Sequence, residues 1–400
     1  MKKLYVIMLA VIALAACVND DKYDLDFFNQ KYGNHGGNEK PEEPEDTTTV
    51  VPEPDTLYVN IVYDGATATL TGDVDKVSVS QSGADVILTS TTDKSLQLTL
   101  SGSSTDGSLL IYSQKMYDMV LNGLQLTNPD GPAINNQCSK LLNLIFADGT
   151  ENTLTDGTEY ATAPTNAEGK SIDQKATFFS EGQICINGTG SLTVYGNAKN
   201  GIASDDYIIF EGGTVNVNMS STGTNGIKVN DGLTINGGTL NIDVMADGAR
   251  GIKNDSYTTI TGGNITITTS GDCLMETVDG VTDASSAAGI KCDSIFTMSG
   301  GTLTISSSGD GGKGINCSQN VEISGGTLTI TTTGKNEDGK PKGIKSDTGI
   351  IVSGGSISVS VKKSWACDNG TDSEDPEDHV TVQGSPTTCT LTKRMVIISY

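Results

Sequence analysis

Carboxylates recur at fixed positions along residues 200–361, and their spacing could serve to bind a cation. A short Gly-Ile phrase returns six times there, and acidic or amide residues stand at constant offsets from it. A hard cation such as calcium takes several oxygen ligands, so a column of carboxylates predicts a calcium site. For any single aspartate, a turn-capping role at a strand end is the alternative. The candidate ligands in these columns are Asp205, Asp206, Asp231, Asp255, Asp293 and Asp347. Asp272 and Asp310 are further candidates, from a second acidic set that precedes the Gly-Ile corner, where the repeat length varies.

Basic residues form a second column beside these carboxylates. They could pair with the carboxylates of an acidic sugar, but a solvated charge ladder with the neighbouring aspartates is favoured, because stacked like charges repel. A calcium-dependent lyase would need a cationic base, and Arg250 and Lys253 are the candidates for that role. The lysines of the column are Lys228, Lys253, Lys291 and Lys345.

Aromatic residues that could stack on sugar rings are scarce, at 5% of the chain. Tyr207 and Tyr257 are candidate sugar contacts and share one repeat position two repeats apart, and we place Leu233 between them. This arrangement predicts no continuous aromatic platform. Because neutral polysaccharides are commonly gripped by aromatic side chains, it favours an acidic sugar bridged by calcium.

The element that must position these residues is a repeating β-coil. The Gly-Ile phrase and a Gly-Gly pair that follows it both advance by 25, 25, 38, 25 and 29 residues. Each unit holds three short runs of alternating apolar and polar residues, as in 226–229, 233–235 and 239–244. Alternation indicates strands with one buried face, and the Gly-Gly pairs indicate corners. The pattern therefore predicts an all-β fold, a parallel β-helix whose coils bury their apolar faces by stacking.

Composition excludes several function classes. The chain has 400 residues and a formal net charge of −24, so nucleic acid is not expected as a partner. Its two histidines are His35 and His379, which leaves little material for a histidine metal site or a Ser/His/Asp triad.

The N-terminus carries an export signal. Residues 1–16 combine two lysines with an apolar run, and the small residues before Cys17 resemble a bacterial lipobox. The resemblance implies lipidation of Cys17, and a plain secretory signal is the alternative. The acidic cluster at 19–21 resembles the surface-export signal of Bacteroidetes lipoproteins. We expect a surface-exposed outer-membrane lipoprotein that contacts the membrane through its lipid anchor only.

The remaining segments follow in order. Residues 17–55 are an acidic, proline-rich tether, 56–94 an N-terminal β cap, and 95–365 the β-helix. Residues 366–400 are expected to close the helix with strands at 379–382 and 389–400.

Seven cysteines remain besides Cys17. Cys292 and Cys317 share an inward column, either as stacked thiols or as a disulfide. Cys367 and Cys389 could form a disulfide that staples the C-terminal segment, since export permits disulfides.

Several separated motifs together resemble one family. They are residues 98–103, 122–124, 131–135, 152–157, 179–182 and the Gly-Ile and Gly-Gly array. They look like the calcium-binding, right-handed β-helix carbohydrate-binding family first described in cellulolytic clostridia, which has lipoprotein versions in gut Bacteroidetes. The resemblance covers roughly residues 60–365. It implies a right-handed fold similar to pectate lyases, bound calcium, and binding of cellulosic or acidic plant-type polysaccharide, without establishing lyase activity.

Three functions follow as hypotheses. The first is a tethered, non-catalytic polysaccharide-binding lipoprotein that works with calcium, with other cell-surface glycan-uptake proteins as possible partners. The second is a calcium-dependent polysaccharide lyase, and the third is an adhesin for a host protein or glycan. The few basic residues count against the lyase.

Overall fold

The computed structural model describes residues 56–166, 168–335 and 339–400. The predicted signal peptide, Cys17 and the tether lie outside these residues. The chain divides into two compact units, one of which comprises Asp55–Thr162 and Gln174–Tyr400 and is called the solenoid here. The other includes Ala163–Asp173, where Thr165 and Ser171 form an isolated antiparallel bridge.

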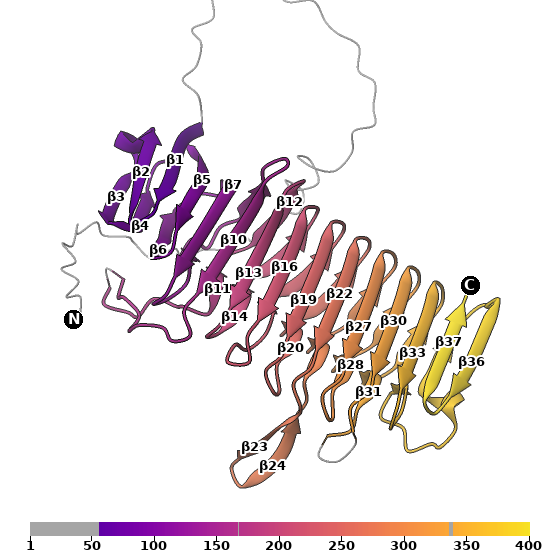
Figure 1. Cartoon of the computed structure of the whole chain (residues 1–400). Helices are drawn as coiled ribbons and strands as arrows, with labels where there is room; N and C mark the ends of the chain where they lie inside the picture. The colour runs from indigo at the N-terminus through magenta and orange to yellow at the C-terminus, as the bar shows by residue number, and fades with distance from the viewer. Residues whose placement is uncertain (1–55, 167, 336–338) are drawn as a thin grey trace, which may run out of the picture. The chain divides into compact units, whose positions relative to one another are not determined.

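The solenoid consists of coils of three strands, and equivalent strands of successive coils pair in parallel to form three stacks (Figure 1). In one coil these are β17 (Ile227–Val229), β18 (Gly232–Ile235) and β19 (Thr239–Val244). Each pairs with its counterpart in the next coil, for example Ile227 with Ile252 and Leu240 with Ile265. The predicted all-β parallel β-helix of three-strand coils is confirmed.

The strands of each stack have the following bounds. The first stack contains β4 (Ala84–Ser90), β6 (Gly107–Ser113), β8 (Ile134–Asn136), β11 (Ala176–Ser180), β14 (Asn200–Ser204), β17, β20 (Arg250–Asn254), β25 (Ala288–Cys292), β28 (Lys313–Cys317), β31 (Lys342–Ser346) and β34 (Cys367–Asp368). The second contains β9 (Leu142–Phe146), β12 (Ile184–Gly188), β15 (Tyr207–Phe210), β18, β21 (Tyr257–Ile260), β26 (Phe296–Met298), β29 (Val321–Ile323), β32 (Ile350–Val352) and β35 (Thr381–Val382). The third contains β10 (Glu151–Asp156), β13 (Ser191–Gly196), β16 (Thr214–Met219), β19, β22 (Asn264–Thr269), β27 (Thr302–Ser307), β30 (Thr327–Thr332) and β33 (Ser356–Val361).

At the N-terminal end, β1 (Thr56–Asp64), β5 (Ser95–Ser104) and β7 (Tyr117–Asn128) are long strands that pair in parallel. The N-terminal half of β7 pairs with β9 and its C-terminal half pairs with β10, so this one strand belongs to two stacks. The short β2 (Thr67–Gly72) and β3 (Ser78–Ser82) run antiparallel to β1 and β4, with the 3-10 turn η1 (Val74–Lys76) between them. Of the segment 56–94 that is expected to form a cap, β2 and β3 are antiparallel strands, whereas β1 and β4 pair in parallel with strands of the next coil.

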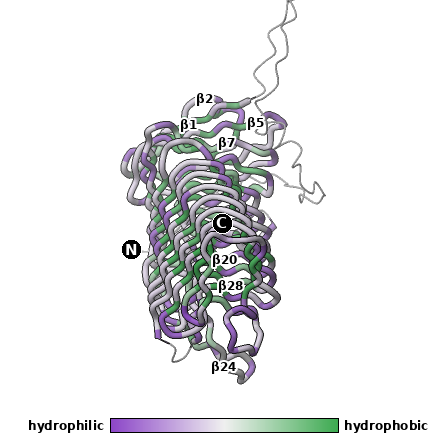
Figure 2. Tube along the Cα trace, turned by 90° about the vertical axis from the view of Figure 1, so that its right-hand side faces the viewer, coloured by the Kyte–Doolittle hydropathy of each residue, from purple (hydrophilic) through white to green (hydrophobic). Residues whose placement is uncertain are grey.

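The core is a set of aliphatic columns, because alternate side chains of all three stacks point inward. Ile252, Ile260, Ile265 and Ile267 of one coil are each no more than 1% exposed. Figure 2 views the coils from the end that carries the C-terminus, where they lie one behind another with hydrophobic and hydrophilic residues alternating along each coil. Corner glycines adopt positive φ, as Gly263 does at +81°, which confirms the interpretation of the Gly-Gly pairs.

The longest insertion of the repeat array leaves the solenoid between the third and first stacks. It forms the antiparallel hairpin of β23 (Leu274–Val278) and β24 (Val281–Ser285), which projects from the coils in Figure 1.

The C-terminal segment differs from the prediction. Residues 389–400 form a hairpin of β36 (Thr388–Thr392) and β37 (Met395–Ser399) rather than one strand, and β37 pairs antiparallel with β33. The segment expected as a strand at 379–382 begins at the end of the 3-10 turn η2 (Pro376–His379) and includes the short β35. Lys393 and Arg394 lie at the hairpin turn, and the hairpin places Val396 and Ile398 in the core.

Cys367 and Cys389 are both free thiols, the first buried in β34 and the second exposed on β36, so the suggested disulfide is not formed. Cys292 and Cys317 lie in register on neighbouring strands as buried thiols. Among the described residues, no helix has the length and apolar character needed to cross a membrane.

Candidate functional site

The predicted lysine column is present on the outward side of the first stack. Lys228 lies in register with Lys253, and Lys253 with Lys291, while Asn316 separates Lys291 from Lys345. The register therefore brings together the residues that the repeat alignment placed in one column.

Each lysine of this column pairs with an aspartate of the chain itself. Lys228 and Lys253 both pair with Asp255, the latter at 3.6 Å. Lys291 pairs with Asp293 at 2.8 Å, and Lys345 pairs with Asp347. Asp205 is paired in the same way, with Lys175. We call this set of ion pairs the charge ladder.

Within the charge ladder, the charge of each partner shifts the pKa of the other toward the ionised form. Burial acts to raise the pKa of Asp255, but hydrogen bonds and charges from Lys228 and Lys253 bring it below its ordinary value. Burial lowers the pKa of Lys228, and Asp255 opposes that change. A ligand carboxylate or a cation would have to compete with these existing pairs.

Asp206 and Asp231 differ, because neither pairs with a basic residue in the part of the chain that the structure describes. The Asp206 carboxylate accepts hydrogen bonds from Gln183 Nε2 at 2.5 Å and from the Tyr207 backbone nitrogen at 2.9 Å. Burial, with a smaller contribution from Asp231, raises the pKa of Asp206. Asp272 likewise has no ion pair with a lysine among the described residues, but Asp206 and Asp231 also repel each other, so these two would gain most from a cation.

The acidic residues before the Gly-Ile corner have a structural role. The backbone nitrogen of Asp272 donates to Asp247 Oδ1 at 2.8 Å, and that of Asp310 donates to Asp272 Oδ1 at 2.7 Å. The backbone nitrogen of Lys335 donates to Asp310 in the same way, at 2.8 Å. One oxygen of each carboxylate thus ties its corner to the next coil, as in turn capping.

The two candidate tyrosines are separated by Gly232, and the placement of Leu233 between them was wrong. Gly232 begins β18, so Leu233 points into the core. The ring of Tyr257 lies over Gly232, with its Cζ atom 2.5 Å from the point where a β-carbon would stand. Because Gly232 has no side chain, the Tyr257 ring can lie over β18, the strand between the two tyrosines.

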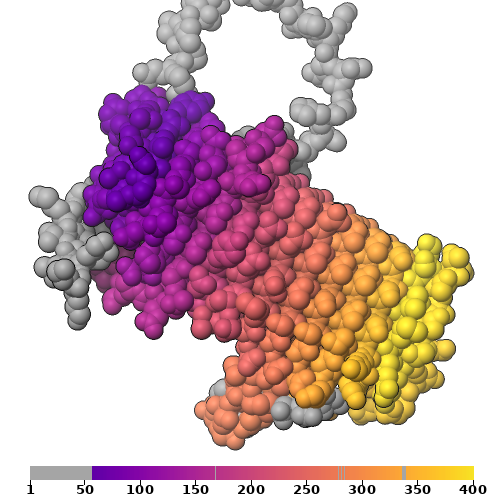
Figure 3. All heavy atoms as spheres, in the orientation of Figure 1, coloured from indigo at the N-terminus to yellow at the C-terminus, as the bar shows by residue number. Residues whose placement is uncertain are grey.

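A groove that the sequence analysis did not predict lies on the outward face of the third stack, across β13, β16, β19 and β22. Its volume is about 370 Å³. Figure 3 shows this side of the solenoid as a broad surface on which the side chains of successive coils lie next to one another. The lining residues are Thr193, Tyr195, Asn216, Asn218, Asn241, Ile242, Asp243, Thr266 and Thr268.

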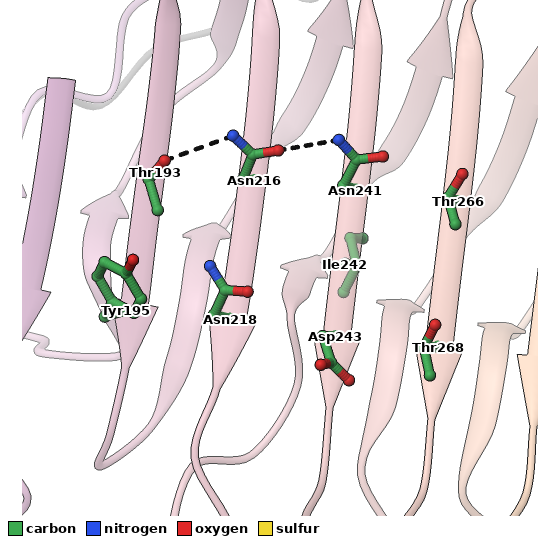
Figure 4. Close-up of a pocket in the computed structure, with 9 residues that line it drawn as sticks. All are labelled: Thr193, Tyr195, Asn216, Asn218, Asn241, Ile242, Asp243, Thr266 and Thr268. Carbon is green, nitrogen blue, oxygen red and sulfur yellow. Dashed lines mark hydrogen bonds between the residues drawn. The ribbon is translucent and has the colours of Figure 1, made fainter. Parts of the chain in front are cut away.

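The polar residues of the groove form two rows (Figure 4). In the first row, Asn241 Nδ2 donates to Asn216 Oδ1 at 2.9 Å, and Asn216 Nδ2 donates to Thr193 Oγ1 at 3.4 Å. The second row begins with Tyr195, which is 46% exposed, and continues with Asn218 and Asp243. Amides, hydroxyls and a carboxylate beside an exposed aromatic ring can hydrogen-bond sugar hydroxyls and stack on a sugar face. Aligning the third run of each repeat would have revealed these rows.

A family model described as "Carbohydrate-binding domain-containing protein" matches residues 82–275 and 244–339, which together exceed half of the chain. The chain belongs to this carbohydrate-binding domain family. A member from Acetivibrio thermocellus, itself described as a carbohydrate-binding domain-containing protein, is 31% identical over 121 residues. That alignment covers 30% of this chain and 41% of the relative, so the chain spans about two fifths of the relative's length.

A solved structure also resembles this member of the family. It is described as the polysaccharide lyase-like protein from C. thermocellum in a gadolinium derivative. The TM-score is 0.50 and the sequence identity 27%, and the match covers 68% of this chain and 96% of the other. The likeness extends over most of the solenoid.

In this family member, the candidate bases Arg250 and Lys253 both project from β20 but have different surroundings. Lys253 belongs to the charge ladder. Arg250 Nη2 donates to Ser285 Oγ at 2.7 Å, and its Nε is buried with no hydrogen-bond partner among the described residues. Burial lowers the pKa of Arg250, against the opposing charges of Glu276 and Asp293.

Proposed function

We propose that this protein is a surface-tethered lipoprotein that binds polysaccharide without cleaving it. Membership of a carbohydrate-binding domain family supports the ligand class. The observation that carries the proposal is the groove, in which two rows of amides and hydroxyls lie beside exposed Tyr195. The lipid on Cys17 and the outer-membrane location are part of the proposal and rest on the export signal.

The groove fits an extended polymer better than a small molecule. It is open and crosses four strands of one stack, which repeat at about 4.8 Å. Beyond the groove, Thr304 and Thr329 continue the row of Thr266 over the next coils. A polysaccharide lying across the coils would therefore meet a similar set of donors and acceptors at each step. Cellulosic or acidic plant cell-wall polymers are the proposed ligands.

Calcium is proposed as a second ligand, at Asp206 and Asp231, which lie at the corner between the first and second stacks and apart from the groove. Both carboxylates lack a basic partner among the described residues, and a calcium ion would relieve the repulsion between them. The calcium would supply charge that a bridging sugar carboxylate could share.

The test is a polysaccharide-binding assay on the purified protein with cellulose and polygalacturonate, in calcium and in EDTA. We expect binding that Tyr195→Ala weakens about tenfold, because a sugar-stacking ring contributes about 1 kcal/mol or more. Thr331→Ala, two strands beyond the groove in the same row as Tyr195, is the matched control. Absence of binding to both polymers would contradict the proposal, and formation of unsaturated uronide product would contradict its non-catalytic part.

For calcium, the measurement is titration of the metal into the wild type and into Asp206→Asn/Asp231→Asn. We expect the double variant to lose calcium binding, while Asp347→Asn, whose carboxylate already pairs with Lys345, retains it. Unchanged calcium affinity in the double variant would place the metal elsewhere. Absence of calcium binding by the wild type would exclude the metal.

A further inference from the structure

Two cations that the charge ladder does not neutralise lie beneath the β23–β24 hairpin. Arg250 on β20 and Lys313 on β28 belong to one outward row, with Ala288 of β25 between them. Ala288 carries only a methyl group and is fully buried, whereas the two long side chains are partly exposed. We call this pair of cations at the base of the hairpin the cationic notch.

The base of the hairpin holds both head groups. Arg250 donates to the hydroxyl of Ser285, and the ammonium group of Lys313 donates to the hydroxyl of Ser286, the next residue. Ser286 is 4% exposed, so this anchor lies inside the structure rather than on a free loop. Two consecutive serines thereby direct a guanidinium and an ammonium group toward the same place.

Neither cation has a counter-charge within ion-pair distance among the residues that the structure describes. The neighbouring lysines of the same face all do: Lys291 pairs with Asp293, Lys342 with Asp368 and Lys345 with Asp347. In addition, Arg250 Nε is buried, and no described residue forms a hydrogen bond with it. Burying a charge without a partner costs free energy, and a donor with no acceptor adds to that cost.

The surroundings of Lys313 are positive overall. Burial and the charges of Lys345, Lys342 and Arg250 lower its pKa to about 8, with Cys273 acting in the opposite direction. Glu276 and Asp293 act on Arg250 at longer range without forming an ion pair with it. In a chain with a net charge of −24, this local excess of unpaired positive charge is unusual.

We propose that the cationic notch is a calcium-independent binding site for an oxyanion carried on a glycan, with Arg250, Lys313 and the serines of the hairpin base as its donors. A carboxylate or sulfate group would accept from the partly exposed side chains of Arg250 and Lys313, and would supply the missing counter-charge. This inference rests on the proposed glycan-binding function but concerns a different face from the groove.

The experiment measures binding of the full-length protein in EDTA to polygalacturonate, which offers carboxylates, to carrageenan, which offers sulfates, and to cellulose, which is neutral. We expect wild type to bind one or both anionic polymers, and the polymer bound identifies the anion. Arg250→Gln/Lys313→Gln should weaken that binding about tenfold or more, because charge-assisted hydrogen bonds are lost. Lys345→Gln, on the same face but paired with Asp347, is the matched control and should retain binding.

A pH series adds a readout that a merely structural role would not change. Wild-type affinity for the anionic polymer should fall as the pH rises through about 8, since Lys313 then loses its charge. Lys313→Arg should bind over the same range without this fall. An identical pH profile for the wild type and Lys313→Arg, or unchanged affinity in the double glutamine variant, would overturn the notch. The proposal would also be overturned if the protein bound inorganic sulfate but neither of the two anionic polymers.

The binding pattern over the three polymers distinguishes failure of the notch from failure of the proposed function. If cellulose binding persists and responds to Tyr195→Ala while the notch variants bind anionic polymers like wild type, only the notch is excluded. Loss of binding to all three polymers by the wild-type protein would exclude both.

Discussion

The Cγ2 methyl of Ile267 lies 2.3 Å from the point where a β-carbon on Gly251 would stand. The same relationship recurs in neighbouring coils, as between Ile242 and Gly226 at 2.5 Å. The invariant glycine of the Gly-Ile phrase therefore faces the interior, where the first stack approaches the third. Its function is to let two strands pack closely.

Gly251→Ala should consequently destabilise the solenoid by about 1–3 kcal/mol, since the added methyl overfills a packed core. The melting temperature measured by circular dichroism would report this. Gly349→Ala is the control, because its β-carbon would meet only Asn320 Oδ1 at 3.4 Å. Equal melting temperatures for the two variants would show that the core can absorb the methyl.

Asn241→Ala should weaken binding of the polysaccharide about fivefold. The change removes the donor to Asn216 and one amide of the groove, and a hydrogen bond contributes about 1 kcal/mol. Isothermal titration with a soluble oligosaccharide of the bound polymer checks this. Thr234→Ala, an outward threonine of the second stack rather than the third, should leave the affinity unchanged. A similar loss in both variants would argue against the groove.

Asp368→Asn should destabilise the C-terminal coil by about 3 kcal/mol, because it leaves Lys342 buried without its partner. The Lys342 side chain is 8% exposed, and the two charged groups lie 2.5 Å apart. As a control, Asp347→Asn removes a carboxylate that is 52% exposed and should cost less than about 1 kcal/mol. Chemical denaturation of both variants measures the difference.

The same ion pair predicts a loss of stability in acid. Burial acts to raise the pKa of Asp368, but the hydrogen bond and charge of Lys342 hold it below its ordinary value. A folded-state pKa below the unfolded value stabilises above about pH 4, and this contribution disappears as the pH falls through the folded value. Wild type should therefore lose more stability than Asp368→Asn in this range. Parallel pH profiles for the two proteins would contradict this.

Thiol reactivity should separate the described cysteines by burial. Cys389 is exposed and should react with a thiol reagent in the native state. Burial raises the pKa of Cys185 and Cys367 to about 12, so both should react only on unfolding. Mass spectrometry of the labelled peptides over time gives the order. Early labelling of Cys367 would reveal opening of the C-terminal coil.

The repeat made most of the fold predictable. Once the Gly-Ile phrases were aligned, alternation fixed which residues point inward, and the register that places Lys228 beside Lys253 followed. The predictions failed where the repeat ends or is interrupted. The sequence predicts one strand at 389–400 because the turn residues, Lys393 and Arg394, are neither glycine nor proline, the residues that usually mark a turn. The sequence did not place Gly232 between the two tyrosines, because a glycine at the start of a strand resembles a corner glycine.

The site was less predictable than the fold, because its properties depend on partners across coils. Sequence placed the lysines and aspartates side by side but could not say that Asp255 would accept from two lysines while Asp231 accepts from none. The groove was missed because its threonines and asparagines are ordinary strand residues. Only their alignment over successive coils turns them into a surface. The cationic notch likewise depends on a hairpin whose docking no periodicity predicts.

The 25-residue step that separates β17 from β20 and β16 from β19 also defines how this protein could change length. A duplicated coil would fit between its neighbours with every inward column continued, since each coil contacts only the coils beside it. Gene duplication or slippage within the array would then lengthen the outward face of the solenoid by one coil at a time. The length of polymer that the protein can contact would therefore depend on the number of repeats in the gene rather than on any single side chain.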